Sequence, residues 1–285
     1  IKLLAYSEVR EVIPLNGCST YRVKVERKPR YVDEAKCTGC RVCVEKCPTR
    51  IPSEFDFGMG MRKAIFIPFQ QAVPAIATID RESCLHFTKG ICGVCEKVCP
   101  AGAVDYEQKQ REETLEVAAI IVATGFDILD PGILQQYGYG RFKNVVTAPQ
   151  YERLMSAAGP TGGEVVRPSD GKRPKSVVFI QCVGSRNVDV KPYCSQICCM
   201  YATKQALSTR EHYPDTRATI LYNDIRAVGK GHEELVRRAQ EEFKVQYVKG
   251  LPGEVLEDPA TENLTVRYSD IVSGEVRTEE AELVV

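Results

Sequence analysis

The sequence predicts an α/β fold together with a small cysteine-rich domain. Three observations lead to this prediction. Two stretches, 115–125 and 175–182, are continuously apolar, as strands are when both faces of a parallel sheet are covered. The second stretch precedes alternating helix and strand patterns, an order typical of a doubly wound sheet. Most of the thirteen cysteines lie within positions 37–99, where their spacing repeats.

The composition is that of a globular protein with room for about two domains in 285 residues. The formal net charge is zero, so charge gives no reason to expect nucleic acid or a membrane surface as a partner. No apolar run is long enough to span a membrane, and the first residues do not resemble a signal peptide. So many cysteines without a secretory signal indicate metal ligation in a reducing compartment, and we expect a cytoplasmic location.

The first thirty residues are predicted to form a β-hairpin. Residues 1–12 and 21–27 alternate apolar and polar side chains, and Asn16-Gly17 between them is a typical turn. Cys18 follows this turn without a neighbouring partner in the sequence, so we interpret it as a structural thiol.

The cysteine-rich domain, expected over 31–110, contains two related motifs. The first reads C-x2-C-x2-C-x3-C-P and the second ends in C-x2-C-x3-C-P, with its first cysteine set further back. This is the spacing of two-cluster bacterial ferredoxins, in which the fourth cysteine of each run ligates the other cluster. The crossed rule predicts a first cysteine set of Cys37, Cys40, Cys43 and Cys99. It predicts a second cysteine set of Cys47, Cys84, Cys92 and Cys95.

Zinc is the alternative to iron, because paired C-x2-C motifs are ordinary zinc ligands. Zinc does not require the additional cysteine after three residues or the proline that follows each run, so the spacing favours iron–sulfur clusters. We expect His86 to tune a potential or to lie on the surface. The interval 51–80 is longer than the connection of a minimal ferredoxin, and we expect an ordered loop with a short strand near 64–67.

The next stretch is predicted to begin the α/β part of the chain. Residues 115–125 are predicted to form a buried strand that ends in Ala123, Thr124 and Gly125, and open α/β sheets bind ligands at such strand ends. The interval 126–174 is rich in glycine and proline and contains one predicted helix, over 149–158.

The last part of the chain alternates strands and helices. We predict strands over 175–182, 218–222 and 245–248, helices over 198–213 and 232–243, and a hairpin of 254–256 with 264–268. Residues 281–285 resemble the first half of another strand. No G-x-G-x-x-G loop occurs. We therefore expect an internal piece of a longer polypeptide.

A third cysteine set lies between the first of these strands and the helix that follows. Its members are Cys182, Cys194, Cys198 and Cys199. A helix N-terminus stabilises thiolates and would hold the last three near one point. Spacing alone leaves a third cubane cluster, a dithiol redox centre and structural thiols as alternatives.

The same region carries a resemblance to a known family. The run 179–186, which reads FIQCVGSR, and the run 193–206, which reads YCSQICCMYATKQA, resemble the signature of the A subunit of heterodisulfide reductase. Four further motifs resemble that family in the same order: ATGFD at 123, YGYG at 137, PTGG at 160 and DIR at 224. The resemblance covers essentially the whole chain.

The resemblance implies a partial thioredoxin-reductase-like dinucleotide-binding core with an inserted two-cluster ferredoxin domain. In that arrangement, 1–30 is a hairpin of the flavin domain, 111–174 is its return strand and connector, and 175–285 is a Rossmann-like domain with a cluster-binding loop. It also implies FAD and three 4Fe–4S clusters, the third held by the third cysteine set. Residues implied to lie near the flavin are Ala123, Thr124, Gly125, Gly184, Ser185, Arg186 and Lys204, with Lys204 at the isoalloxazine ring.

The implied activity is electron transfer in a heterodisulfide reductase-type complex, with flavin-based electron bifurcation that couples ferredoxin and disulfide reduction. The implied partners are the other subunits of such a complex, an electron-input hydrogenase or formate dehydrogenase, and ferredoxin. Two alternatives remain: a related quinone-linked or sulfur-metabolism electron-transfer flavoprotein, and a zinc-stabilised interaction module without redox activity. The sequence does not separate a methanogenic pathway from sulfur metabolism.

Overall fold

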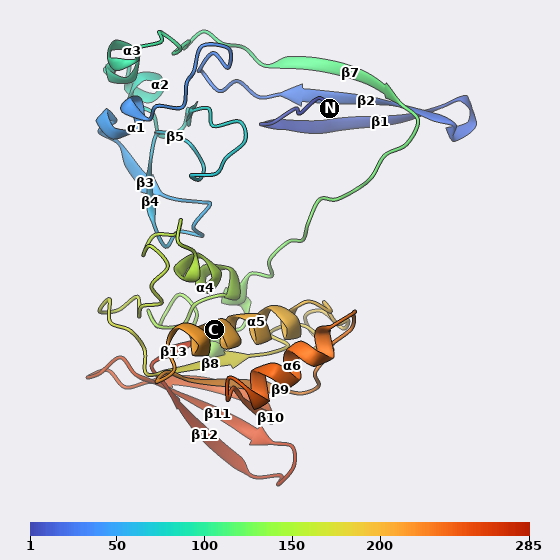
Figure 1. The fold of residues 1–285 in the computed structure, drawn as a ribbon, viewed down its shortest axis with the longest axis vertical. Helices are drawn as coiled ribbons and strands as arrows, with labels where there is room; N and C mark the ends of the chain where they lie inside the picture. The colour runs from blue at the N-terminus through green and yellow to red at the C-terminus, as the bar shows by residue number, and fades with distance from the viewer. The chain divides into compact units, whose positions relative to one another are not determined.

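A computed structural model describes residues 1–285 apart from the side chain of Cys18, on which one expectation above falls. The chain divides into two compact units, Ile1–Phe126 and Asp127–Val285. Figure 1 shows both units along the chain. Each unit has its own sheet structure, and each is taken separately below.

The first unit contains an antiparallel sheet of three strands in the order β1-β2-β7. Strands β1 (Ser7–Leu15) and β2 (Thr20–Arg27) form the predicted hairpin, and β7 (Arg111–Val117) pairs with β2. The turn η1 (Asn16–Cys18) has positive φ at Asn16 and Gly17, as the Asn-Gly pair predicts. The first strand starts at Ser7, so the prediction for residues 1–12 was too long at its beginning.

The cysteine-rich part of this unit is built from short elements, with Val32 and Val104 bridging its two ends. Its helices are α1 (Val42–Lys46), α2 (Leu85–Lys89) and α3 (Val94–Val98), and α1 packs against α3. Its strands are β3 (Arg50–Pro52), β4 (Met61–Lys63), β5 (Ile65–Phe66) and β6 (Thr78–Ile79), paired as β3-β4 and β5-β6. The core joins aliphatic side chains with the sulfur atoms of the cysteine motifs.

The interval 51–80 is ordered around one arginine. The Arg62 guanidinium lies 3.1 Å from a carboxylate oxygen of Asp80 and 2.5 Å from Glu54, and it lies over the Phe66 ring at 4.1 Å. The carboxylate of Asp80 also accepts hydrogen bonds from Ser83 and from the backbone of Glu82, at 2.7 and 3.1 Å. These contacts confirm the predicted ordered loop, and β5 confirms its short strand.

The expectation of a buried strand over 115–125 was wrong. The strand β7 ends at Val117, and residues 118–128 are extended and exposed, including Ile121 at 93% and Val122 at 78%. Apolar side chains form a buried strand only where neighbouring strands pair with the backbone. The described residues supply no such neighbour for 118–128.

The second unit contains a six-stranded sheet in the order β12-β11-β10-β9-β8-β13. Four strands are parallel, namely β8 (Ser176–Ile180), β9 (Arg217–Tyr222), the first part of β10 (Gln246–Glu257) and β13 (Leu283–Val284). Read by position in the chain, their order is 3-2-1-4, the beginning of the doubly wound order of dinucleotide-binding folds. The sequence therefore predicted the class of this sheet correctly.

Helices cover one face of the parallel strands, and the antiparallel hairpin of β11 (Leu264–Asp270) and β12 (Val276–Ala281) covers the other (Figure 1). The helices are α4 (Ala148–Met155), α5 (Cys198–His212) and α6 (His232–Glu241), preceded by short 3-10 turns at Pro131–Ile133 and Gln135–Tyr137. Phe179 of β8 contacts Tyr151 of α4 edge to face, with ring centroids 5.4 Å apart. Its neighbours Val178 and Ile180 point the other way, because side chains alternate along a strand, and pack under β11.

Two predictions about the end of the chain need correction. The strand 245–248 and the first strand of the hairpin are one long strand, β10, which changes partner from β9 to β11 (Leu264–Asp270) at Gly250. A bulge between Pro252 and Glu254 bends it, and Gly253 supplies the extra residue. The strand β12 (Val276–Ala281) was not predicted, because both of its faces carry charged side chains and neither is apolar throughout. None of the described helices is long and apolar enough to cross a bilayer.

Candidate metal centres

The first cysteine set lines one cavity of the cysteine-rich part. This cavity has an empty volume of about 370 Å³, partly open to solvent, and its cysteines are Cys37, Cys40, Cys43 and Cys99. The first three belong to one loop, which curls because Gly39 and Arg41 have φ values of 69° and 67°. Cys99 arrives from the end of α3, which packs on α1.

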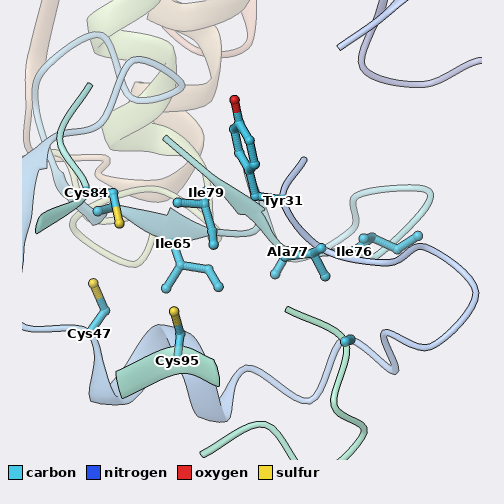
Figure 2. Packing of buried hydrophobic residues seen from close by; sticks show 11 residues of the cluster. Tyr31, Cys47, Ile65, Ile76, Ala77, Ile79, Cys84 and Cys95 are labelled. Atoms are coloured by element: carbon cyan, nitrogen blue, oxygen red, sulfur yellow. The ribbon is translucent and has the colours of Figure 1, made fainter. Parts of the chain in front are cut away.

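The second cysteine set lines a separate cavity of about 320 Å³, also partly open. Its cysteines are Cys47, Cys84, Cys92 and Cys95. Cys47 ends α1, whereas Cys84 precedes α2 and Cys95 lies on α3. Figure 2 shows the sulfur atoms of Cys47, Cys84 and Cys95 turned toward one space beside Ile65. The structure thus brings together both sets that the crossed rule predicted.

Ile65 lies between the two cavities. Its side chain is 2% exposed and lines both of them. It belongs to β5, whose pairing with β6 places Ile65 opposite the equally buried Ile79. The interval 51–80 therefore supplies the wall that separates the two cysteine sets.

Several polar contacts surround these sulfurs. The Tyr106 hydroxyl lies 3.1 Å from Cys95 Sγ, and the backbone N–H of Ala103 donates to Cys99 Sγ at 3.3 Å. Lys63 donates to the backbone carbonyl of Cys47 at 2.5 Å. Burial raises the pKa of the Cys43 thiol to about 11. Burial also raises the pKa of Cys95, against the effect of the Tyr106 hydrogen bond.

Within the described residues, no three Cys, His, Asp or Glu side chains are placed to hold a single metal ion. The four cysteines of each set instead line a cavity. A cubane cluster suits such an arrangement, because each thiolate ligates a different iron.

The third cysteine set also comes together. Cys182 follows β8 with a φ of 58°, and Cys198 and Cys199 begin α5. The Cys182 and Cys198 thiols are hydrogen-bonded, which raises the pKa of Cys182 and lowers that of Cys198. Hydrogen bonding to Cys198 also raises the pKa of Cys199, whose charge interacts with that of Cys194. Three of the four thiols, those of Cys182, Cys198 and Cys199, therefore form one hydrogen-bonded group at the N-terminus of a helix.

An arginine and an aspartate fix the loop around this set. Arg186 pairs with Asp224 at 2.9 Å and interacts with the Cys182 thiol. The Cys199 thiol donates to the carbonyl of Asp224 at 3.6 Å and accepts from the backbone N–H of Arg226 at 3.4 Å. The segment after β9 thus supports both ends of the third cysteine set.

The strand order explains why the third set lies at this place. The loop that contains Cys182 leaves the carboxyl end of β8, which has β9 on one side and β13 on the other. The chain reverses its direction of winding between these neighbours. Open α/β sheets bind ligands in the crevice at such a switch point.

The residues expected near a flavin lie in several places. Ala123, Thr124 and Gly125 belong to the exposed segment 118–128. Gly184 is pressed against Leu129, where a Cβ atom would lie 2.2 Å from the leucine side chain. The Ser185 hydroxyl donates to the Tyr193 carbonyl at 2.9 Å. The expected contacts of these residues with a flavin remain predictions.

Lys204 forms an ion pair with Glu152 of α4. It lies five residues after Cys199 on α5, about 140° around the helix from that cysteine. The described contact of Lys204 is thus with α4 and not with the third cysteine set.

Sequence reasoning missed three residues at these sites: Ile65, Tyr106 and Asp224. Ile65 lay in the predicted short strand, but nothing in the sequence indicates that it separates two cavities. Tyr106 follows the last cysteine of the domain by seven positions, outside any ligand spacing. Asp224 did carry a signal, because it begins one of the motifs that resemble the family.

Comparison with known proteins agrees with this geometry. Residues 30–53 match the family model of a 4Fe-4S binding domain. The chain is 50% identical over 286 residues to the iron-sulfur A subunit of the CoB–CoM heterodisulfide reductase of Methanocaldococcus jannaschii. It is 49% identical to the A subunit of the H(2)/formate:CoB-CoM heterodisulfide,ferredoxin reductase of Methanococcus maripaludis, and 43% identical to the A subunit of the ferredoxin:CoB-CoM heterodisulfide reductase of Methanosarcina mazei.

Each of these alignments covers 100% of the chain, and the chain spans 42%, 42% and 35% of the respective relatives. The identity includes both units, and the matched family model lies over the first ferredoxin motif. The chain therefore belongs to the family of heterodisulfide reductase A subunits.

Proposed function

We propose that this chain is an electron-transfer segment of a heterodisulfide reductase-type oxidoreductase, with three 4Fe–4S clusters and an FAD in the complete protein. One observation carries the proposal. Each of two neighbouring cavities is lined by one complete, crossed set of four cysteines. This distribution matches the ligand rule of two-cluster ferredoxins and not that of zinc ribbons.

The residues around the two cavities fit cubane clusters. The first and second cysteine sets supply four thiolate ligands each, and Ile65 separates their cavities with an aliphatic wall. Apolar neighbours such as Ala77 and Ala103, which are 2% and 1% exposed, line the first cavity beside its cysteines. When bound, the clusters supply one-electron redox chemistry at potentials set by hydrogen bonds and solvent exposure.

The third cysteine set supplies the ligands for the third cluster in this proposal. Cys198 and Cys199 lie at the start of α5, where the pKa of Cys198 is lowered, and the Arg186–Asp224 pair holds the loop near Cys182. Its place at the switch point of the sheet is where a cofactor of a dinucleotide-binding fold lies. This placement supports a thioredoxin-reductase-like core and a position next to FAD.

The proposal for FAD rests on the family. Ala123, Thr124, Gly125, Gly184, Ser185, Arg186 and Lys204 are the residues we propose near it. Lys204 would supply a cation that stabilises an anionic reduced flavin. The partners we propose are the other subunits of such a complex, a hydrogenase or formate dehydrogenase that supplies electrons, and ferredoxin, in the cytoplasm. Flavin-based bifurcation between ferredoxin and a disulfide is the activity we propose for the complete protein.

Metal analysis with electron paramagnetic resonance (EPR) tests the cluster content. Anaerobically purified chain should contain roughly twelve irons, from three cubes, and should show cubane signals after reduction. Zinc in place of iron, in a colourless protein, would overturn the proposal and favour the zinc-stabilised module.

Two double variants test the crossed ligand sets, and each is the control for the other. Cys37→Ser with Cys99→Ser removes two ligands from one proposed cluster, so one of the two ferredoxin-type signals should disappear and the other remain. Cys37→Ser with Cys47→Ser removes one ligand from each, so both signals should be perturbed. The opposite pattern would show that the sets are not crossed.

A further inference from the structure

A tyrosine reaches into the cavity of the second cysteine set. Tyr106 lines this cavity, and its hydroxyl lies 3.1 Å from Cys95 Sγ. With a free thiol, either atom could be the donor. A thiolate that ligates iron has no proton, so the hydroxyl must then donate the hydrogen bond to sulfur.

The orientation of this hydroxyl is fixed by a stacked histidine. The His86 ring lies parallel to the Tyr106 ring, with centroids 3.6 Å apart and an interplanar angle of 9°. Nδ1 of His86 lies 2.8 Å from the carbonyl oxygen of Cys92. A carbonyl only accepts, so Nδ1 carries a proton and donates it. Phe87 makes edge contacts with both stacked rings, with its centroid 5.7 Å from that of Tyr106 and 5.4 Å from that of His86.

The first cysteine set has no equivalent contact. Among the described side chains, none donates a hydrogen bond to the sulfur of Cys37, Cys40, Cys43 or Cys99. The backbone N–H of Ala103 donates to Cys99 at 3.3 Å. The two sets therefore differ by one side-chain hydroxyl at sulfur.

We infer that the Tyr106 hydroxyl raises the reduction potential of the cluster held by the second cysteine set, and that His86 positions the tyrosine ring. The inference rests on the proposed function, because it needs a cluster at this site. A reduced cluster carries more negative charge than an oxidised one, so a hydrogen bond to its ligand sulfur stabilises the reduced form more. Tyr106 tunes the cluster through its hydroxyl and is not a ligand, and His86 is the positioning residue.

The variant Tyr106→Phe tests the inference in the full chain that carries its clusters. It removes the hydroxyl and keeps the ring that stacks on His86. At a fixed potential, the ratio of reduced to oxidised second-set cluster should fall about tenfold, which corresponds to 59 mV for one electron. EPR-monitored redox titration measures this ratio for each cluster.

The matched control is Tyr31→Phe. Tyr31 belongs to the same core and contacts Phe87 at 4.5 Å, and Figure 2 shows its hydroxyl pointing away from the sulfurs. This control should leave every midpoint potential unchanged. Unchanged potentials in Tyr106→Phe, with iron content intact, would overturn the inference. Iron missing from the unmodified chain would instead overturn the proposed function.

A second measurement covers the case in which Tyr106→Phe does not retain iron. Ring-deuterated tyrosine is incorporated into the unmodified chain and into the Tyr31→Phe control, and pulsed EPR is recorded after reduction. Deuterium coupling to the second-set cluster in both samples is expected, because the Tyr106 ring adjoins Cys95. Absence of this coupling would overturn the inference.

Discussion

At the scale of single residues, the first cysteine set depends on a glycine that has no room for a side chain. Gly39 has a φ of +69°, and a Cβ atom there would lie 2.4 Å from the backbone carbonyl oxygen of Ala75. Two effects thus exclude other residues: the left-handed backbone and the close approach of the 51–80 loop. The loop between Cys37 and Cys43 and the loop around Ala75 hold each other in place.

We predict that Gly39→Ala removes the cluster of the first cysteine set and leaves that of the second. The clash with Ala75 must move the loop that carries Cys37, Cys40 and Cys43. Iron bound by the cysteine-rich part should fall by roughly half, because one of two cubes is lost. Iron analysis and the number of EPR signals measure the loss.

Gly58→Ala is the control for backbone strain. Gly58 has a φ of +78° in the same unit, but a Cβ atom there meets nothing within 4 Å. This variant should retain its iron. Equal iron loss in both variants would show that strain alone, and not the contact with Ala75, accounts for the effect.

At the scale of elements, α4 and α5 are joined by a charged contact next to a buried one. Lys204 pairs with Glu152, and Gln205 donates to the same carboxylate at 3.1 Å. Beneath them, the Tyr151 hydroxyl lies 2.6 Å from that of Thr209. Burial alone would raise the pKa of Glu152, but the hydrogen bonds from Lys204 and Gln205 outweigh it and hold the pKa below its usual value.

The depressed pKa of Glu152 determines the direction in which the unfolding free energy changes with pH. A carboxylate whose folded pKa lies below its unfolded value stabilises the fold above the unfolded value, and the contribution is lost as the pH falls through the folded value. We predict that Glu152→Gln lowers the unfolding free energy at pH 7, and that the difference from the unmodified chain disappears once the pH has fallen through the depressed folded pKa. Urea unfolding followed by circular dichroism, at pH 7 and at low pH, measures this.

Glu241→Gln serves as the comparison. Glu241 ends α6, and its carboxylate has no ion pair within the described residues. This variant should change the unfolding free energy little at either pH. A Glu152→Gln effect that persists at low pH would mean that shape, and not charge, joins the two helices.

The elements themselves show how far sequence patterns reach. Helix α5 and strands β8 and β9 were predicted within two residues at their ends, because their apolar spacing reflects burial within one unit. The long strand β10 was predicted as two strands, since a change of partner at Gly250 leaves no mark other than glycine and proline. Segment 118–128 has the apolar character of a buried strand, but burial depends on neighbours that its own residues do not encode.

The candidate sites also contain some features that local sequence patterns predict and others that they do not. Ligand spacing predicted which cysteines line each cavity, because a tight loop can bring only near neighbours to one cube. The contacts of Tyr106 and Ile65 depend on how separate loops pack in three dimensions, and no local pattern records them. Lys204 was assigned to the flavin site from the resemblance to the family. Its described partner, Glu152, lies fifty-two positions earlier in the chain.

At the scale of the whole molecule, the chain is two units joined by an exposed segment. Phe126 is 66% exposed and lies at the boundary between Ile1–Phe126 and Asp127–Val285. Extended, exposed backbone is the preferred substrate of proteases. We predict that brief chymotrypsin treatment cleaves first at Phe126, and that the N-terminal fragment retains the iron of the first two cysteine sets.

Mass spectrometry of the fragments, with iron analysis of each, measures this outcome. The variant Phe126→Ser should slow the first cleavage, whereas the buried Phe179, which is 1% exposed, should not be cut early. First cleavage inside the cysteine-rich part would contradict the division into two units.

The wall formed by Ile65 has a further consequence for magnetism. One aliphatic side chain, that of Ile65, lines both cysteine-lined cavities, so unpaired electrons placed in both would lie within range of dipolar interaction. The spectrum of the fully reduced protein would then not be the sum of two isolated paramagnets, and its lines would broaden and split. The size of this splitting would then report the distance between the paramagnetic centres on the two sides of Ile65.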